Sequence, residues 1–275
     1  MDKTLYLSEA KGLEVLRDGP SLWIKQENKA GRRIPARRVG RVIIIGNVRM
    51  DSGVITLFTE NDIPVTLMDT KGDEVAVTVP YNHKLPRHRK EQKIYLKNEE
   101  CIKKFNMWLA SNRRRVQLGV IKRLSEDKLA KFCSFGFKEK EYQEFISGYK
   151  RSIETPWHSV NSLVSNIFRE MILAALIKAD LDPHIGVLHR RHNFSLALDI
   201  CHILGPEEDL QTIQFFGGNV GKGCLDENSD GSVRSKDAIK DIVHRFENRR
   251  KTLLNMTEKI IDDLFELMRD LRYEG

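Results

Sequence analysis

The period of the hydrophobic positions changes once along the chain, near residue 80. Before that point, short apolar and β-branched runs alternate with glycine and charged turns, which is the pattern of β-strands. These runs are residues 5–7, 13–16, 22–24, 41–45, 63–68 and 75–79. After residue 93, apolar residues recur at the spacing of amphipathic helices. The pattern predicts an α+β protein in which a β-rich N-terminal domain is followed by an all-helical C-terminal domain.

A polar and basic stretch with two prolines, residues 80–93, separates the two patterns and is typical of a connector. We therefore predict an N-terminal β domain over 1–82, a basic linker over 83–93 and a helical domain over 94–275. Inside the N-terminal domain, residues 52–61 (SGVITLFTEN) predict a short helix with Ser52 as its N-cap.

Five helical patterns follow the linker, at residues 94–109, 113–124, 138–150, 160–179 and 237–271. The second is either a separate helix or a continuation of the first. We expect the last to be two helices broken near Asn248. Residues 219–235 are rich in Gly, Asp, Asn and Ser and predict a loop.

The helix predicted over 160–179 carries an apolar stripe with one acid inside it. Leu163, Ile167, Ala174 and Ile177 define the stripe, and Glu170 lies midway along it. A carboxylate in that position is either drawn toward the core or held at a site. A proline disfavours helix in the preceding residue, so the helix should end before residues 182–183 (Asp-Pro).

Composition limits the class of protein. The chain of 275 residues is 40% hydrophobic and 31% charged, which is ordinary for a globular protein with a sizeable core. No apolar run approaches the roughly 18 residues that span a membrane, and the first residues lack the apolar core of a signal peptide. The four cysteines are widely spaced and predict reduced thiols. We therefore expect a cytoplasmic protein with no membrane contact.

Positive charge is concentrated in one segment. Residues 83–123 contain thirteen Lys or Arg and three Asp or Glu, a net charge of +10, whereas the whole chain carries +7. Clustered cations suit a polyanion, because neutralising phosphates releases counterions. We expect Arg113, Arg114 and Arg115 to bind nucleic acid on this basis. A solvated surface without a partner explains the same charge equally well.

Three side chains that suit metal chemistry lie beside apolar runs. Glu170, His189 and Asp199 fall within thirty residues of one another, and buried charges are normally paired or bind metal. Each also has an ordinary structural explanation: an acid paired with an arginine, a hydrogen-bonded core histidine, and a turn or cap residue. A zinc site is a further alternative, although its spacing is irregular. Its ligands would be His189, His192, Cys201 and His202.

The sequence motifs around these residues resemble those of a known family. The sequence LDPHIGVLH followed by SLALDI, after a helix with an inward Glu, is similar to the CRISPR-associated integrase and endonuclease family, the first CRISPR-associated protein. Residues 33–35, 42–48 and 61–65 also match its N-terminal strand, turn and strand pattern. The resemblance covers about residues 1–80 and 158–200. The chain departs from it at His202, where the family usually has an acid, and at residues 204–206 (Leu-Gly-Pro), where it usually has Phe-Arg-Pro.

The resemblance implies a metal-dependent DNA endonuclease and integrase that inserts new spacers into a CRISPR array. A DNA 3′-hydroxyl would attack a phosphodiester, and Glu170, His189 and Asp199 would be the catalytic residues and the ligands of a manganese or magnesium ion. Arg190 and Arg191 would hold DNA phosphates. The family also implies a homodimer through the N-terminal domain and a small second CRISPR-associated protein as partner, in a prokaryotic cytoplasm. A nucleic-acid-binding protein without catalysis is the alternative.

Overall fold

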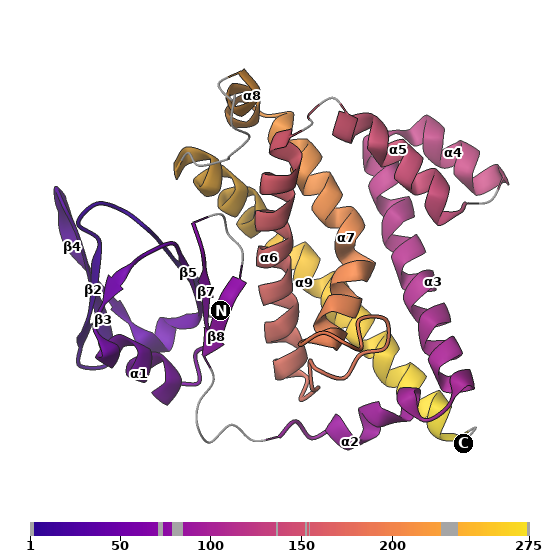
Figure 1. Cartoon of the computed structure of the whole chain (residues 1–275), viewed down its shortest axis with the longest axis horizontal. Helices are drawn as coiled ribbons and strands as arrows, with labels where there is room; N and C mark the ends of the chain where they lie inside the picture. The colour runs from indigo at the N-terminus through magenta and orange to yellow at the C-terminus, as the bar shows by residue number, and fades with distance from the viewer. Residues whose placement is uncertain are drawn as a thin grey trace. The chain divides into compact units, whose positions relative to one another are not determined.

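The computed structural model describes residues 3–70, 74–78, 85–135, 137–151, 153, 155–226 and 236–273. The chain divides into two compact units, Met1–Lys84 and Leu85–Gly275. The described part of the first unit holds the strands, and the described part of the second is helical (Figure 1). The predicted α+β class, with β-structure before helices, is confirmed.

One sheet of the first unit is mostly parallel. Its strand order is β1 (Lys3–Ser8), β5 (Val39–Ile45), β7 (Val65–Met68) and β8 (Glu74–Thr78). Strands β1, β5 and β7 run parallel, and β8 is antiparallel to β7. A strand inside a parallel sheet is buried on both faces and therefore reads as a continuous apolar run. Residues 42–45 of β5 (Val-Ile-Ile-Ile) form such a run, and all four side chains are buried.

The second sheet has the order β4 (Lys29–Pro35), β3 (Ser21–Gln26), β2 (Glu14–Asp18) and β6 (Arg49–Met50). Strand β4 has no counterpart among the strands predicted from the sequence. Its residues KAGRRIP are mostly exposed, because β4 lies at the edge of the sheet, where charged side chains are common. A short 3₁₀ turn, Ala36–Arg38, leads from β4 into β5.

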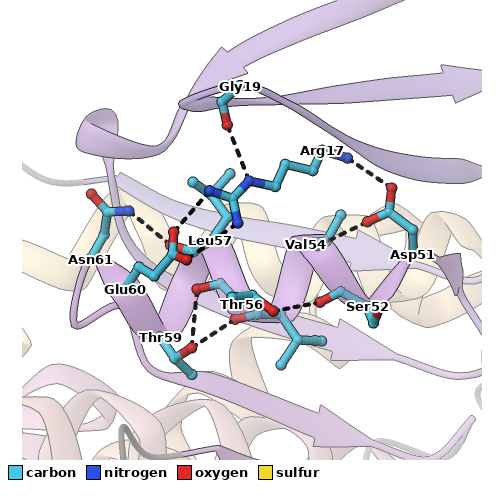
Figure 2. A network of polar contacts seen from close by, with 11 residues as sticks. Arg17, Gly19, Asp51, Ser52, Val54, Thr56, Leu57, Thr59, Glu60 and Asn61 are labelled. Atoms are coloured by element: carbon cyan, nitrogen blue, oxygen red, sulfur yellow. Dashed lines mark hydrogen bonds and ion pairs between the residues drawn. The ribbon is translucent and has the colours of Figure 1, made fainter.

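Helix α1 (Ser52–Glu60) is capped by Asp51, one residue before the predicted cap. Asp51 Oδ1 accepts a hydrogen bond from Val54 N–H at 2.9 Å, and Oδ2 accepts one from Arg17 N–H at 3.1 Å. The Arg17 guanidinium donates to Glu60 at 2.8 Å and to the Gly19 carbonyl at 3.3 Å (Figure 2). These contacts fasten β2 to both ends of α1, whose inner face completes the core of the first unit.

The second unit begins with short helical turns and continues with long helices. Its elements are α2 (Arg89–Gln92), a 3₁₀ turn (Lys93–Leu96), α3 (Glu99–Leu124), α4 (Glu126–Phe135), α5 (Glu139–Arg151), α6 (Thr155–Lys178), α7 (Ser195–Phe216), α8 (Asn219–Asp226) and α9 (Lys236–Tyr273). Helix α7 packs against α6 and α3, and α9 packs across α6 and α7 (Figure 1).

The segments expected at 94–109 and 113–124 belong largely to one helix, α3, which confirms the alternative that the second continues the first. Two further predictions were inaccurate in detail. Helix α9 is unbroken at Asn248, and buried apolar residues line it from Ile242 to Leu271. Residues 219–226 of the predicted loop form α8, while residues 227–235 lie outside the described part of the chain.

Helix α6 is the core helix that the apolar stripe predicted, with one exception. Leu163 and Ile167 are buried, but Ile177 is 44% exposed and does not join the buried face. Within the described residues, only the helix Pro156–Lys178 is long enough and apolar enough on average to cross a membrane, although polar residues interrupt it. Of its most apolar window, 67% is buried within the protein, as expected for a core helix.

Candidate active site

Glu170 faces the interior of the helical unit from the middle of α6. It is 2% exposed, and the residues that follow it, Met171 and Ile172, are also buried. The apolar stripe therefore does draw this carboxylate inward. Because a buried carboxylate needs compensation, its burial marks this part of α6 as a structural or functional centre.

The loop between α6 and α7 is fastened at its start by the residues just before α3. The Gln92 side chain accepts from Asp182 N–H at 2.7 Å and donates to the Asp182 carbonyl at 3.0 Å. Arg89 forms an ion pair with the Asp182 carboxylate at 2.8 Å, and Tyr95 Oη donates to the Ile185 carbonyl at 2.5 Å. Part of the segment that the sequence predicted as a linker thus holds this loop.

The same loop also covers the N-terminus of α7. Ser195 Oγ accepts from Gly186 N–H at 2.8 Å, and Leu196 N–H donates to the Pro183 carbonyl at 2.9 Å, so polar groups of the first turn are satisfied by the loop. A Cβ on Gly186 would lie 2.6 Å from Asp199 Oδ2. Only glycine permits the loop to pass this close to the helix.

Asp199 is fully buried and accepts four hydrogen bonds. Oδ2 accepts from Val187 N–H at 2.7 Å and from Leu188 N–H at 3.3 Å. Oδ1 accepts from His189 N–H at 3.0 Å and from His189 Nδ1 at 2.8 Å. Because a carboxylate only accepts, Nδ1 of His189 carries a proton, and in a neutral imidazole Nε2 then presents its lone pair. Asp199 therefore fixes both the backbone and the tautomer of His189.

These contacts test how well the predicted ligands suit a metal ion. A ligating histidine usually donates its second ring N–H to a carboxylate, which is what His189 does toward Asp199. His189 Nε2 is therefore suited to bind a metal ion. Asp199, with both oxygens engaged in hydrogen bonds, is suited instead to orient the ligating histidine. Across the described residues, no three His, Cys, Asp or Glu side chains are placed to hold one ion. Neither the predicted triad nor the zinc set is therefore assembled as a direct ligand cluster.

A cavity of about 260 Å³ lies beside His189. Its walls include His202 and Gly205 of α7, Glu208 further along the same helix, Arg113 of α3 and Ser165 of α6. The ring centroids of His189 and His202 are 6.3 Å apart. The position at which the chain departs from the family therefore lines the same cavity as His189.

Two groups in this cavity titrate far from their usual range. Burial, and after it the positive charge of Arg113, lowers the pKa of His202 to about 4, so its imidazole is neutral at pH 7. Burial raises the pKa of Glu208 to about 7, although a hydrogen bond from Ser165 acts in the opposite direction. Glu208 was not among the residues expected from the sequence. The only signal for it was a run of three acids, Glu207 to Asp209, inside an otherwise apolar helix.

The five arginines expected to bind nucleic acid differ in their environment. Arg114, Arg190 and Arg191 are exposed, and Arg115 is exposed with an ion pair to Asp263 at 3.1 Å. Arg113 is 8% exposed and engages protein partners. The consecutive arginines 113–115 therefore do not form one surface.

Several solved structures share this architecture. A Cas1 protein from Thermotoga maritima superimposes with a TM-score of 0.70 at 17% identity, covering 98% of this chain and 97% of that one. A casposase bound to an integration product gives 0.67 at 16% identity, covering 99% and 91%. A chain of a Cas6-RT-Cas1–Cas2 complex gives 0.69 at 15% identity, covering 100% of this chain and 35% of its own length. At these identities the likeness establishes the fold.

Sequence comparison identifies the family. The family model described as CRISPR associated protein Cas1 matches residues 5–155 and 135–248. The chain belongs to the Cas1 family, and the resemblance inferred from its motifs is confirmed. A search of curated proteins gives no match.

Proposed function

We propose that this protein is the DNA strand-transfer enzyme of CRISPR adaptation. In this reaction a DNA 3′-hydroxyl attacks a phosphodiester of the repeat array, a new phosphodiester forms, and the 3′-oxygen of the cut strand leaves. With water as the nucleophile, the same site would nick DNA. The observation that carries the proposal is the pairing of His189 with a buried Asp199 beside a polar cavity, in a chain of the Cas1 family.

Each residue of the predicted triad has a separate role in this proposal. His189, through Nε2, and Glu170 would hold a divalent ion, and Asp199 would keep the imidazole of His189 in the required tautomer and orientation. A bound manganese or magnesium ion would supply polarisation of the scissile phosphate and a lower pKa for the attacking hydroxyl. A mixed carboxylate and imidazole set favours manganese. Arg114, Arg115, Arg190 and Arg191 would bind DNA phosphates.

Partners and location follow from the family. The names of the similar structures include an integration product and a Cas1–Cas2 assembly, which supports DNA and a small second CRISPR-associated protein as partners of this chain. We further propose a homodimer through the N-terminal unit and a role in antiviral defence in the prokaryotic cytoplasm. The domain limits that we propose are 1–82 and 94–275 with a link over 83–93, near the division at Lys84.

A strand-transfer assay tests the proposal. A DNA duplex with free 3′-hydroxyls is incubated with a supercoiled plasmid carrying a repeat array, with manganese or magnesium. His189→Ala and Glu170→Ala should each lower the rate roughly a thousand-fold, because a bound metal contributes several kcal/mol to the transition state. Asp199→Asn should lower it about 10–100-fold, the usual effect of losing a carboxylate behind a ligand.

His158→Ala is the matched control, because His158 is an exposed histidine on α6. Circular dichroism and an unfolding curve establish that each variant is folded. Wild-type activity in His189→Ala would contradict the site. Binding of DNA by the wild type with neither strand transfer nor cleavage in either metal would favour the alternative of a non-catalytic DNA-binding protein.

A further inference from the structure

Helix α7 contains a proline at a position where the helix needs a backbone donor. In an α-helix the N–H of each residue bonds the carbonyl four residues earlier. Pro206 has no N–H, so the carbonyl of His202 loses its partner within the helix. Helix α7 nevertheless continues from Ser195 to Phe216 without interruption.

Arg113 of α3 supplies the missing donor. Its Nη1 donates to the His202 carbonyl oxygen. The neighbouring Gly205 admits it, because a Cβ on Gly205 would lie 3.2 Å from Arg113 Nη1, closer than most side chains tolerate. Gly205 and Pro206 together therefore create both the vacant acceptor and the space from which a guanidinium reaches it.

The other side of the guanidinium is anchored by Glu139 of α5. Arg113 Nη2 donates to Glu139 Oε1 at 2.8 Å, and Nε donates to Oε2 at 3.1 Å. Glu139 also accepts from Gln117 at 2.6 Å and from Gln143 at 2.9 Å. A planar guanidinium held on two sides is rigid, and these contacts leave it poorly suited to bind a DNA phosphate.

We propose that Arg113 is a positioning residue: it replaces the backbone amide that Pro206 lacks and so fixes the turn of α7 that places His202 in the cavity shared with His189. Its importance for strand transfer rests on the proposed function, but the contact itself does not. Arg113 then acts separately from Arg114 and Arg115, although the three are consecutive in the sequence.

A double-mutant cycle in the metal-free protein tests the contact. Arg113→Gln removes the donor, and Pro206→Ala restores the backbone N–H. Pro206→Ala should raise the folding equilibrium constant roughly tenfold more in the Arg113→Gln background than in the wild type, because a hydrogen bond from a charged donor contributes about that much. The cycle is measured by urea unfolding.

The NMR signals of the His202 ring report the environment of that side chain. They would not shift if Arg113 contributed only to the stability of the fold. They should shift in Arg113→Gln, return toward the wild-type position in Arg113→Gln with Pro206→Ala, and stay in place in Arg114→Gln. The ring signals of His244, an exposed residue of α9, serve as the internal reference. Strand transfer should fall in Arg113→Gln and recover in the double variant.

The outcomes separate the two proposals. Additive unfolding energies with unmoved His202 signals would overturn the role of Arg113. Coupling and shifted signals in a protein that performs no strand transfer would uphold the role of Arg113 and contradict the proposed function. If Arg113→Gln alone does not fold, a folded double variant supports the proposal; if both fail, the same cycle with Arg113→Lys decides it.

Discussion

Asp199 and His189 illustrate how much one side chain depends on its neighbours. The sequence identified both because they stand beside apolar runs. The sequence could not show that Asp199 accepts four hydrogen bonds, because three of the donors are backbone N–H groups of residues 187–189. Such donors carry no sequence signal, and their positions follow from the turn that Gly186 permits. The acid thus fixes the orientation of the histidine.

His202 is expected to set the metal preference of the site. His202→Glu should raise the rate of strand transfer with magnesium relative to manganese, because magnesium prefers oxygen ligands and a carboxylate adds a negative charge. The measurement is the ratio of the two rates in the wild type and in the variant. His192→Glu is the matched control, because its ring also lies 6.3 Å from that of His189 but it is not among the residues that line the cavity. An unchanged ratio would place His202 outside the site.

Glu208 is expected to make stability depend on pH. The pKa of Glu208 in the folded protein, about 7, lies above the ordinary value of 4.5. Its contribution to the free energy of unfolding is therefore complete below pH 4.5 and is lost as the pH rises through 7. Glu208→Gln should therefore gain stability relative to the wild type between pH 5 and pH 8, on the order of a few kcal/mol. Urea unfolding at both pH values measures it. Glu144→Gln, at an exposed site, should show no such trend; an equal trend in both variants would contradict the prediction.

At the scale of elements, a buried acid joins three helices. Glu207 of α7 is fully buried and binds Arg123 of α3 and Arg249 of α9, the latter at 3.4 Å. Glu207→Gln should lower the free energy of unfolding by about 1–3 kcal/mol, because charged hydrogen bonds are lost in a buried site. Chemical denaturation measures the loss.

The control for Glu207 is an ion pair on the surface. Glu258 pairs with Lys178 at 3.4 Å, and both side chains are exposed. Glu258→Gln should cost less than about 1 kcal/mol, because water screens such a pair. Equal costs for the two variants would mean that the contacts of Glu207 do not join the helices.

The elements that the sequence predicted best are those whose own apolar pattern decides their structure. Strand β5 and helix α6 are of this kind. Strand β4 was missed because an edge strand needs little apolar surface, and its residues are held by pairing with β3. The break expected near Asn248 is absent because the buried face of α9 continues past it, and packing outweighs the low helix propensity of asparagine.

At the scale of the whole molecule, we expect the exposed arginines to set how strongly the proposed DNA binding depends on salt. Each phosphate contact contributes nearly one unit to the slope of log affinity against log salt concentration. Replacing Arg114, Arg190 and Arg191 with Ala should lower that slope by up to about three units and weaken binding to all sequences alike. Fluorescence anisotropy at several salt concentrations measures it.

The control for the charge prediction is Arg269, a cation that is also exposed and lies near the end of α9. Arg269→Ala changes the net charge by one unit without touching the proposed DNA surface, and the slope should stay within about half a unit. A slope unchanged by the triple replacement would mean that these arginines are only solvated.

The attachment of α2 also has a mechanical consequence. The chain enters the second unit at Leu85, and four residues later Arg89 is already bonded to Asp182, with Gln92 and Tyr95 close behind. Tension applied to the chain at Leu85 would therefore reach the turn that precedes His189 directly, without first passing along a long helix. The first residues of the second unit are thus mechanically connected to the loop that carries the histidine.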